Sequence, residues 1–185
     1  MTAVSVAMAV SARAERAGCD FDELVRQHQS MIFSLAYHFL HNREAAEEVA
    51  QEVFLALHRH LADIQSPAHA AFWLRKVAAQ RSIDEARRRQ RRPHVCLEEV
   101  ALQAAAEPAA RMSPGDPMLG ELLRRLIASL PEAPRMVMVM RYQEDLEPSE
   151  IAELLEMPVA TVKSHLQRSL ALLREKLERR GVGER

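Results

Sequence analysis

The stretch LEPSEIAELLEMPVATVKSHLQRSLALLREKL, residues 146–177, constrains the fold more than any other part of the chain. Its first part has apolar side chains at positions that share one side of a short helix, namely Ile151, Ala152, Leu154 and Leu155. Glu156, Met157 and Pro158 interrupt this period, and a longer helical pattern begins at Val159. A short helix, a tight break and a longer helix predict a helix-turn-helix motif, in which the small Ala152 lets the two helices approach closely.

The second helix of this motif carries side chains suited to DNA. Val162 and Leu166 are expected to anchor it to the core, which leaves five polar positions for the outer face: Thr161, Lys163, Ser164, Gln167 and Arg168. Hydroxyl and Lys side chains bind phosphates, whereas Gln and Arg side chains can pair with base edges. The pattern therefore predicts DNA binding. The alternative is an ordinary helical hairpin with solvated charges.

The rest of the chain also favours helices. Five Phe, two Tyr and one Trp are few sheet-forming residues, while Ala, Leu, Glu and Arg dominate. From Phe21 to Phe39 apolar residues recur at three- and four-residue steps, and Asp20 is placed to cap that helix. We predict an all-α protein, with further helices at about 43–61, 69–92, 118–129, 131–142, 148–155 and 159–180.

Pro and Gly divide the helical pattern into two parts. Residues 93–117 contain four Pro and one Gly without a sustained period, so we expect a flexible linker there, with a short helical piece near residues 97–106. The predicted architecture is two small helical domains, residues 20–92 and 118–180, of which the second contains the helix-turn-helix. Residues 1–19 are expected to form a disordered tail and residues 181–185 a short terminal tail.

Charge is segregated along the chain, although the formal net charge is only −1. Residues 75–92 contain eight basic and two acidic side chains, and residues 158–180 contain six basic and two acidic ones. Acidic residues concentrate in 20–63 and 144–156. Because surplus Lys and Arg hold backbone phosphates, two separate basic blocks indicate two contacts with a polyanion, on a chain that also binds another partner.

Three segments, in this order, resemble extracytoplasmic-function (ECF) sigma factors of the sigma-70 family. REAAEEVAQEVFLALHRHL (43–61) is similar to the helix by which that family binds polymerase, and FWLRKVAAQRSIDEARRRQRR (72–92) to its helix for the minus-10 element. Residues 130–177 resemble the domain that reads the minus-35 element. The resemblance covers about residues 20–92 and 118–180, with a variable linker between them.

The resemblance implies promoter recognition and transcription initiation by a dissociable, non-catalytic subunit of RNA polymerase, working in the cytoplasm under an anti-sigma factor. The residues implied in core polymerase binding are Glu44, Glu47, Glu48, Gln51 and Glu52. Those implied at the minus-10 element are Phe72, Trp73, Arg75, Lys76, Arg81, Arg87, Arg88 and Arg89, and the loop at 63–68 is implied to hold an extruded base. The five outer residues of the helix-turn-helix are expected at the minus-35 element. One of Phe72 and Trp73, with Trp73 favoured, is expected at the DNA surface, the alternative being that both are core.

The chain departs from the family pattern at three positions. His165 and Leu170 stand where the family commonly has further arginines, and Pro134 stands where it usually has Gln or Arg. The promoter sequence preferred by relatives is therefore not carried over. Two rival functions remain: a self-sufficient helix-turn-helix regulator that binds operators as a dimer, and an adaptor that binds an anti-sigma factor without promoting transcription.

Other site classes find little support. The sequence has no catalytic triad, phosphate-binding Gly loop or metal cluster, so we expect no enzyme activity, cofactor or metal. The pairs His38/His41 and His58/His60 are poor candidates for metal ligands, since His58 and His60 point to different sides of a helix. Cys19 and Cys96 are too few for a disulfide framework and lack zinc-ligand spacing, which favours a reducing cytoplasm and leaves a redox role open. No apolar run approaches the length of a membrane span, so no membrane insertion is expected.

Overall fold

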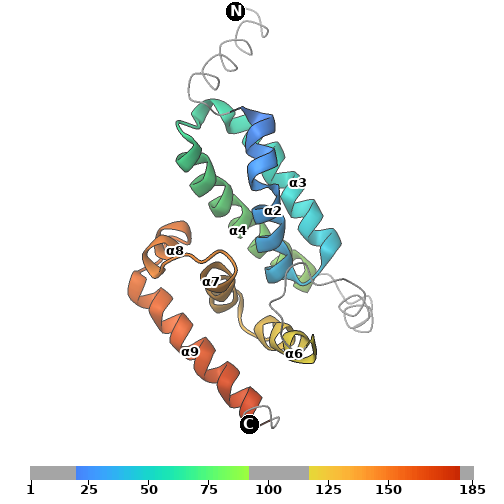
Figure 1. The fold of residues 1–185 in the computed structure, drawn as a ribbon, viewed down its shortest axis with the longest axis vertical. Helices are drawn as coiled ribbons and strands as arrows, with labels where there is room; N and C mark the ends of the chain where they lie inside the picture. The colour runs from blue at the N-terminus through green and yellow to red at the C-terminus, as the bar shows by residue number, and fades with distance from the viewer. Residues whose placement is uncertain (1–19, 92–116, 180–185) are drawn as a thin grey trace, which may run out of the picture.

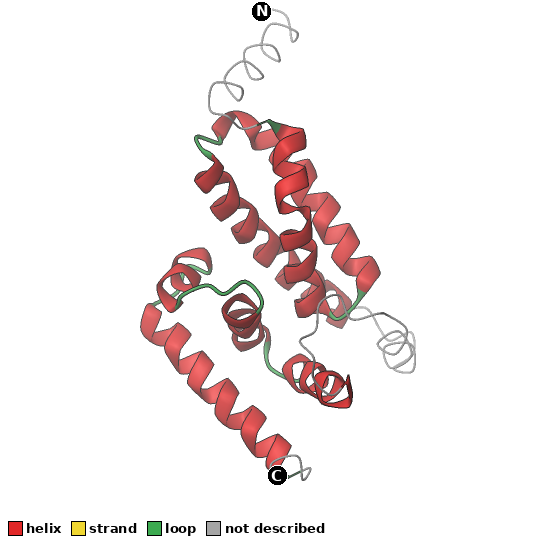
Figure 2. Cartoon of the chain, in the orientation of Figure 1, coloured by secondary structure: helices red, strands yellow, loops and turns green. Residues whose placement is uncertain are grey.

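The computed structural model describes residues 20–91 and 117–179, and every regular element in these ranges is helical (Figures 1 and 2). The all-α prediction is confirmed. The elements are α2 (Phe21–Leu40), α3 (Arg43–His60), the 3-10 helix η1 (Leu61–Asp63), α4 (Pro67–Arg91), α6 (Pro117–Ala128), α7 (Glu132–Tyr142), α8 (Pro148–Leu154) and α9 (Val159–Glu178).

Three helix starts differ slightly from the sequence prediction. Pro117, expected at the end of the linker, is instead the first residue of α6, and α4 begins at Pro67 rather than at residue 69. Helix α7 begins at Glu132, with Pro131 as its N-cap. Proline is well tolerated at a first helical position, because the amide hydrogen it lacks would have had no partner inside the helix. The predictions for the two tails, for most of the linker with its helical piece, and for Cys19 and Cys96 lie outside the described residues.

Local capping explains where the first helices begin and end. The Asp20 carboxylate accepts a hydrogen bond from the Glu23 amide at 3.3 Å, as the sequence predicts, and Asn42 Oδ1 accepts one from the Ala45 amide at 2.8 Å. Between these helices His41 adopts a left-handed conformation (φ 53°), and its amide donates to the Tyr37 carbonyl at 2.8 Å. This cap ends α2 and turns the chain directly into α3.

Helices α2, α3 and α4 form a bundle around a mainly apolar interior, although Ser82 and Glu85 of α4 are also buried. Side chains with essentially no solvent exposure come from all three helices: Ile32, Leu35, Phe39, Val53, Leu57 and Leu74. The C-terminal helices pack around α7, whose residues Met136 to Met140 are all buried. In the helix-turn-helix, Ile151 and Val162 are completely buried and Ala152 is 7% exposed, so the predicted anchoring of α9 is confirmed.

The two groups of helices are packed against each other (Figure 1). Helix α7 contacts α2, and α8 contacts α4. Buried apolar residues of both groups belong to one contiguous cluster, which includes Phe39 and Leu74 on one side and Met136 and Ile151 on the other. A second, smaller cluster joins α6, α7 and α9 through Leu126, Leu130, Met138 and Leu173. Within the described ranges, no helix is both long enough and apolar enough to span a bilayer.

Candidate nucleic-acid interface

The arginine run lies in the last turns of α4, at the side of the bundle. Arg81, Arg87, Arg88 and Arg89 are exposed, whereas Arg75 and Lys76 are half-buried. The structure thus places the predicted basic residues on one 25-residue helix, along most of its length. A helix of this kind can follow a nucleic-acid backbone with successive cationic side chains.

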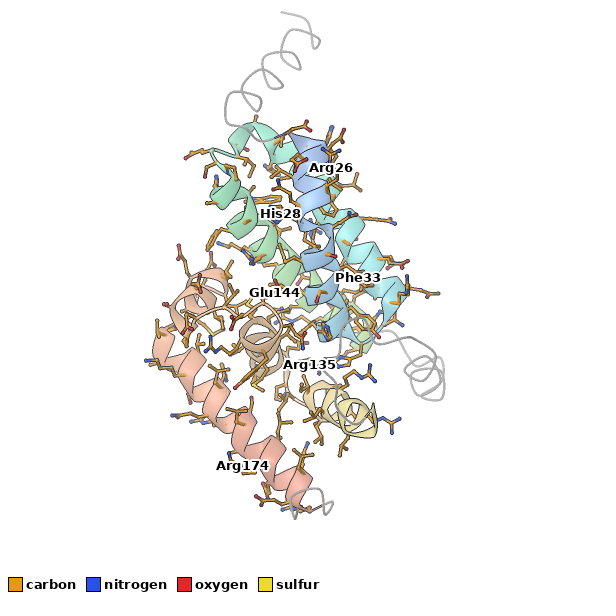
Figure 3. The ribbon with its side chains drawn as sticks, in the orientation of Figure 1. Arg26, His28, Phe33, Arg135, Glu144 and Arg174 are labelled. Carbon is orange, nitrogen blue, oxygen red and sulfur yellow. The ribbon has the colours of Figure 1, made fainter. Side chains whose placement is uncertain are left out.

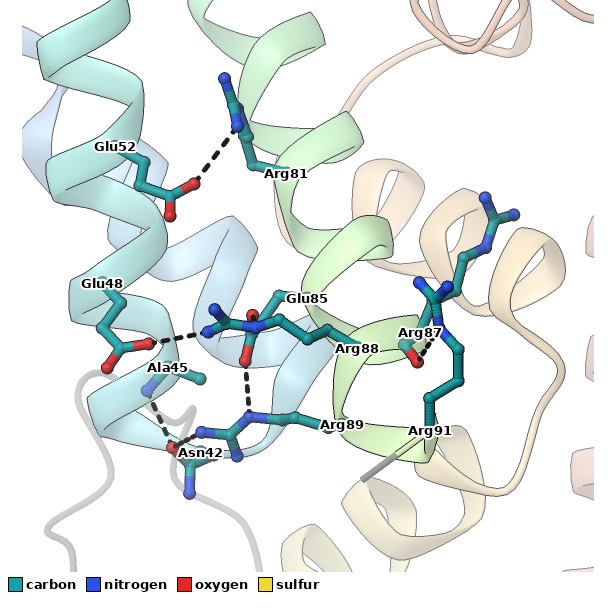
Figure 4. Close-up of polar contacts among 10 residues, drawn as sticks. All are labelled: Asn42, Ala45, Glu48, Glu52, Arg81, Glu85, Arg87, Arg88, Arg89 and Arg91. Carbon is teal, nitrogen blue, oxygen red and sulfur yellow. Dashed lines mark hydrogen bonds and ion pairs between the residues drawn. The ribbon is translucent and has the colours of Figure 1, made fainter. Parts of the chain in front are cut away.

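Four of the α4 and α3 charges are paired with one another (Figure 4). Arg81 Nη1 donates to Glu52 Oε2 at 3.4 Å, and Arg88 Nη2 donates to Glu48 Oε2 at 3.4 Å. These glutamates belong to the predicted polymerase-binding face and these arginines to the predicted minus-10 set. The structure therefore brings the two predicted surfaces together along the α3–α4 seam. Such exposed pairs are weak and exchange readily with other partners.

Glu85 orients the end of the arginine run. Its side chain is only 10% exposed and accepts from Arg88 Nε at 2.6 Å and from Arg89 Nε at 2.9 Å. Burial acts to raise the pKa of the Glu85 carboxyl, but its hydrogen bonds and charge interactions with the two guanidinium groups hold that pKa below its ordinary value. Arg89 Nη2 also donates to Asn42 Oδ1 at 3.2 Å, which connects α4 to the cap of α3 (Figure 4). Sequence reasoning missed Glu85 as the organiser of this cluster, although its spacing to both arginines is a helical pairing signal.

The predicted polymerase-binding face of α3 is exposed at all five positions, Glu44, Glu47, Glu48, Gln51 and Glu52. Glu47 pairs with Arg43 one turn earlier, at 2.8 Å. Leu55 lies on the same helix and is 58% exposed. Acidic side chains beside an exposed Leu form a surface that can bind a partner carrying both basic and apolar groups.

Phe72 and Trp73 are both partly buried and pack against the core at the start of α4. The Trp73 ring also contacts the His60 ring, with centroids 5.9 Å apart. Neither aromatic side chain is fully buried, so each keeps an edge or face that solvent or a base can reach. In the preceding loop Ile64 is buried, and Ser66 Oγ accepts a hydrogen bond from the His69 amide at 3.1 Å.

The N-terminal half of α9 presents its polar side chains outward. Lys163, Gln167 and Arg168 are exposed, and Thr161 and Ser164 are half-buried. Among the described residues, none of these five side chains has a hydrogen-bond or ion-pair partner. The helix starts directly after the turn at Glu156, a left-handed residue (φ 53°) that aims α9 away from α8. This geometry leaves the first two turns of α9 available to enter a DNA groove.

The histidine pairs His38/His41 and His58/His60 are poorly placed to bind a metal ion. Burial lowers the pKa of His38, and it lowers the pKa of His41 to about 4. The His58 ring contacts Phe21, whereas His60 contacts Asp63 and Trp73. In the part of the chain that the structure describes, no group of three or more His, Cys, Asp or Glu side chains could hold a metal ion.

Comparison with known proteins matches both groups of helices to one family. The Sigma-70 region 2 family matches residues 24–92, and the Sigma-70 region 4 family matches residues 120–173. ECF RNA polymerase sigma factor SigW of Bacillus subtilis is 30% identical over 167 residues, which are 85% of this chain and 88% of SigW. The chain belongs to the ECF sigma factors of the sigma-70 family. Helices α2 to α4 form its region 2, and α6 to α9 form its region 4.

Other relatives of this sigma factor agree. ECF sigma factor SigE of Mycolicibacterium smegmatis is 32% identical over 158 residues, covering 85% of this chain but only 61% of SigE. Two solved structures share the fold. CnrH in complex with the cytosolic domain of CnrY gives a TM-score of 0.62 at 20% identity, over 91% of this chain and 94% of CnrH. RpoE of Bartonella quintana with the anti-sigma factor NepR gives 0.65 at 14% identity, over 86% and 97% of the two chains.

Proposed function

We propose that this ECF sigma factor directs RNA polymerase to promoters through two DNA-reading helices, α4 for the minus-10 element and α9 for the minus-35 element. The observation that carries the proposal is the exposed N-terminal half of α9, where Lys163, Gln167 and Arg168 have no partner among the described residues. Gln and Arg can make bidentate contacts with adenine and guanine, whereas Lys acts on phosphate as a point charge. The five minus-35 residues named from the sequence remain our assignment.

The exposed acidic face of α3 is our candidate for docking on the polymerase core. Glu44, Glu47, Glu48, Gln51 and Glu52 are all exposed there, beside Leu55. A surface without a strong positive charge is a poor DNA ligand but a suitable protein ligand. Polymerase would then hold α4 and α9 over the same promoter and raise the effective concentration of each domain at its element.

That gain is needed because region 4 has little net attraction for DNA. Residues 118–185 contain eleven basic and eleven acidic side chains. A free chain with this balance should bind duplex DNA weakly, since the non-specific part of DNA affinity comes from surplus positive charge. The same property argues against the self-sufficient regulator, which must bind its operator without polymerase.

We further propose that this sigma factor works in the cytoplasm, has no catalytic activity of its own and is restrained by an anti-sigma factor. Support for the last point comes from its fold neighbour, RpoE of Bartonella quintana, which was solved with the anti-sigma factor NepR. Support for a non-catalytic role comes from the family, whose members are subunits of RNA polymerase without catalytic activity of their own.

In vitro transcription with purified core polymerase tests the proposal. The full chain should add new initiation sites on genomic template fragments, and core enzyme alone should not. A self-sufficient regulator would bind DNA tightly and specifically without core and add no start sites. An adaptor would do neither and would only relieve a sigma factor from its inhibitor.

A further inference from the structure

Exposed apolar side chains are concentrated on α9. The described residues include five large hydrophobic side chains that are exposed to solvent, and three of them lie on this helix: Val159, Leu170 and Leu172. Leu170 is 42% exposed, and it belongs neither to the two buried apolar clusters nor to the residues that pack against them. A single exposed leucine is ordinary on a protein surface, but several on one helix indicate a contact surface. The packing of region 4 therefore does not account for Leu170.

Leu170 lies on the same side of α9 as two residues that we assign to the minus-35 element. Because α9 is continuous over this part of the chain, Leu170 follows Gln167 by about one turn and Lys163 by about two. Both of these residues are exposed, and Arg174 continues the same side one turn beyond Leu170 (Figure 3). At a rise of about 1.5 Å per residue, Leu170 is roughly 4.5 Å along the helix axis from Gln167, which corresponds to about one to two base pairs at about 3.4 Å each. Leu170 can thus reach a base pair close to the one that Gln167 contacts.

The major groove offers one apolar group to a side chain of this kind. Its base edges carry hydrogen-bond donors and acceptors, and thymine adds the C5 methyl group. A leucine side chain neither donates nor accepts a hydrogen bond, so its favourable contact in the groove is with that methyl group. Against another base it would cover a donor or an acceptor that otherwise binds water, which carries a penalty. Leucine at this position therefore favours thymine and disfavours the other bases.

We propose that Leu170 is a specificity residue for the minus-35 element and contacts the C5 methyl group of a thymine, about one to two base pairs from the base that Gln167 reads. The inference rests on the proposed function, because it requires α9 to lie in the major groove. It adds an apolar contact to the polar contacts assigned to this helix. Burial of one methyl group changes affinity by about three- to five-fold. Leu170 is therefore expected to set the preference at one base position and to supply little of the total affinity.

Removal of the thymine methyl group tests this contact without any change to the protein. Library selection with the wild-type holoenzyme first defines a preferred minus-35 sequence. Each thymine of that element, on either strand, is then replaced singly by deoxyuridine, which deletes the C5 methyl group and keeps every hydrogen-bonding group of the base. Fluorescence anisotropy measures holoenzyme binding to each labelled duplex. The same selection and the same series of duplexes are then measured with Leu170→Ala and with Leu172→Ala in the full chain.

Leu172→Ala is the matched control, because it makes the same substitution on the same helix at a residue that is 38% exposed. Leu172 is two residues further on, so it lies roughly 200° around the helix from Leu170. Alanine has the highest helix propensity, so we expect both variants to fold, and urea unfolding followed by circular dichroism checks this. Wild type and Leu172→Ala should lose about three- to five-fold in affinity at one deoxyuridine position. Leu170→Ala should bind the two duplexes equally at that position, and its selected library should lose the thymine preference there.

The inference fails if wild-type affinity is the same for every deoxyuridine duplex, a result that does not depend on how the variants fold. It also fails if Leu170→Ala keeps the full methyl effect or if Leu172→Ala removes that effect as well. Weaker binding of Leu170→Ala to core polymerase without DNA would assign Leu170 to a protein interface and overturn the inference too. A wild-type holoenzyme with no minus-35 preference and no new start sites would contradict the proposed function itself. A clear minus-35 preference that is indifferent to thymine methyl groups would contradict only the role of Leu170.

Discussion

The guanidinium carbon of Arg135 lies 5.4 Å from the centroid of the Phe39 ring, which joins α7 of region 4 to α2 of region 2. The same guanidinium donates through Nη2 to the carbonyl of Ala128, the last residue of α6, at 2.6 Å and to that of Leu130, in the turn before α7, at 2.8 Å. One side chain therefore completes the α6–α7 turn and covers a core aromatic residue of the other region.

Replacing Arg135 by Met should lower the free energy of unfolding by about 2 to 4 kcal/mol. The change removes charge-assisted hydrogen bonds, worth about 1.5 to 3 kcal/mol as a set, and a cation–π contact worth about 0.5 to 1 kcal/mol. Urea unfolding followed by circular dichroism measures the loss. Arg141→Met is the control, because among the described residues Arg141 bonds within region 4, to Leu146 and Glu147. An Arg135→Met variant no less stable than this control would contradict the assignment.

Reversing the charges of Glu48 and Glu52 to Lys should weaken binding to core polymerase and leave the bundle folded. Both side chains are exposed on the proposed docking face. The change also places cations beside Arg88 and Arg81, so a small loss of stability should accompany it. Anisotropy with labelled sigma factor and purified core measures the affinity. The control carries Asp22→Lys and Glu153→Lys, two exposed acids elsewhere. Unchanged core affinity in the Glu48/Glu52 variant would exclude this face.

Trp73→Ala should impair strand opening more than closed-complex binding. Stacking of an unpaired base on an aromatic ring contributes roughly 1 to 3 kcal/mol. Because Trp73 also packs on the core and on His60, the variant should lose some stability as well. Trp73→Phe keeps a stacking surface and serves as the control. Permanganate footprinting reads the open complex, and normal thymine reactivity with Trp73→Ala would show that the ring does not act on bases.

Lys163→Ala and Gln167→Ala should separate phosphate contact from base reading in α9. The first should weaken holoenzyme binding to all promoters alike and reduce the salt slope by about one unit. The second should relax preference at one base position of the minus-35 element by about 1 to 3 kcal/mol. Arg174→Ala, further along the same exposed face of α9, should do neither. Holoenzyme binding, measured over a series of salt concentrations and over a library of minus-35 sequences, distinguishes a phosphate contact from base reading. Equal effects of Lys163→Ala and Arg174→Ala would remove α9 from the groove.

His41 should make the fold sensitive to mild acid. Burial lowers its pKa to about 4 from an ordinary 6.5, with smaller contributions from Arg135, His38 and Arg124, so the folded state binds fewer protons than the unfolded state between these values. The contribution of neutral His41 to the free energy of unfolding is therefore fully present above about pH 6.5. It decreases as the pH falls toward 4, and by pH 5 about 2 kcal/mol of it is lost.

His41→Asn removes this titration and keeps a residue that tolerates the left-handed cap. Its unfolding free energy should fall less than that of wild type between pH 7.5 and 5. The pKa of His28 and His38 is also lowered by burial, and the raised pKa of Glu144 acts in the opposite sense, so the informative quantity is the difference between variant and wild type. Exposed His58→Asn is the control. Parallel pH profiles for wild type and His41→Asn would show that His41 does not carry the effect.

Much of region 4 was predictable because its signals are local. The spacing of Ile151, Ala152 and Leu154 places them on one side of a short helix, and Pro158 marks a turn, without reference to the rest of the chain. The same holds for Asp20, whose carboxylate caps α2 as predicted. The outward position of Lys163, Gln167 and Arg168 followed from the burial of Val162 on the same helix.

The partners of the charged residues were not predictable in this way. Glu48 and Arg88 are forty residues apart, and Glu144 and Arg75 are separated by the rest of α4, the linker and the first two helices of region 4. The helical spacing predicts that such side chains lie on the exposed side of their own helix. It does not predict which side chains of other helices they contact. The role of Arg135 is not visible in the sequence for the same reason, since it depends on Phe39, which is ninety-six residues away on α2.

The sequence alone determined that the chain is all-α, where its helices lie to within a few residues, and that α9 has a polar outer face, because caps, breaks and the 3.6-residue period act over a few residues. Only the tertiary structure decided that Glu132, Glu144 and Glu156 meet the basic residues of α4, and that Arg135 covers Phe39. These contacts depend on how two helical groups are oriented, and that orientation is set by packing of apolar surfaces far apart in the chain, which no local pattern records.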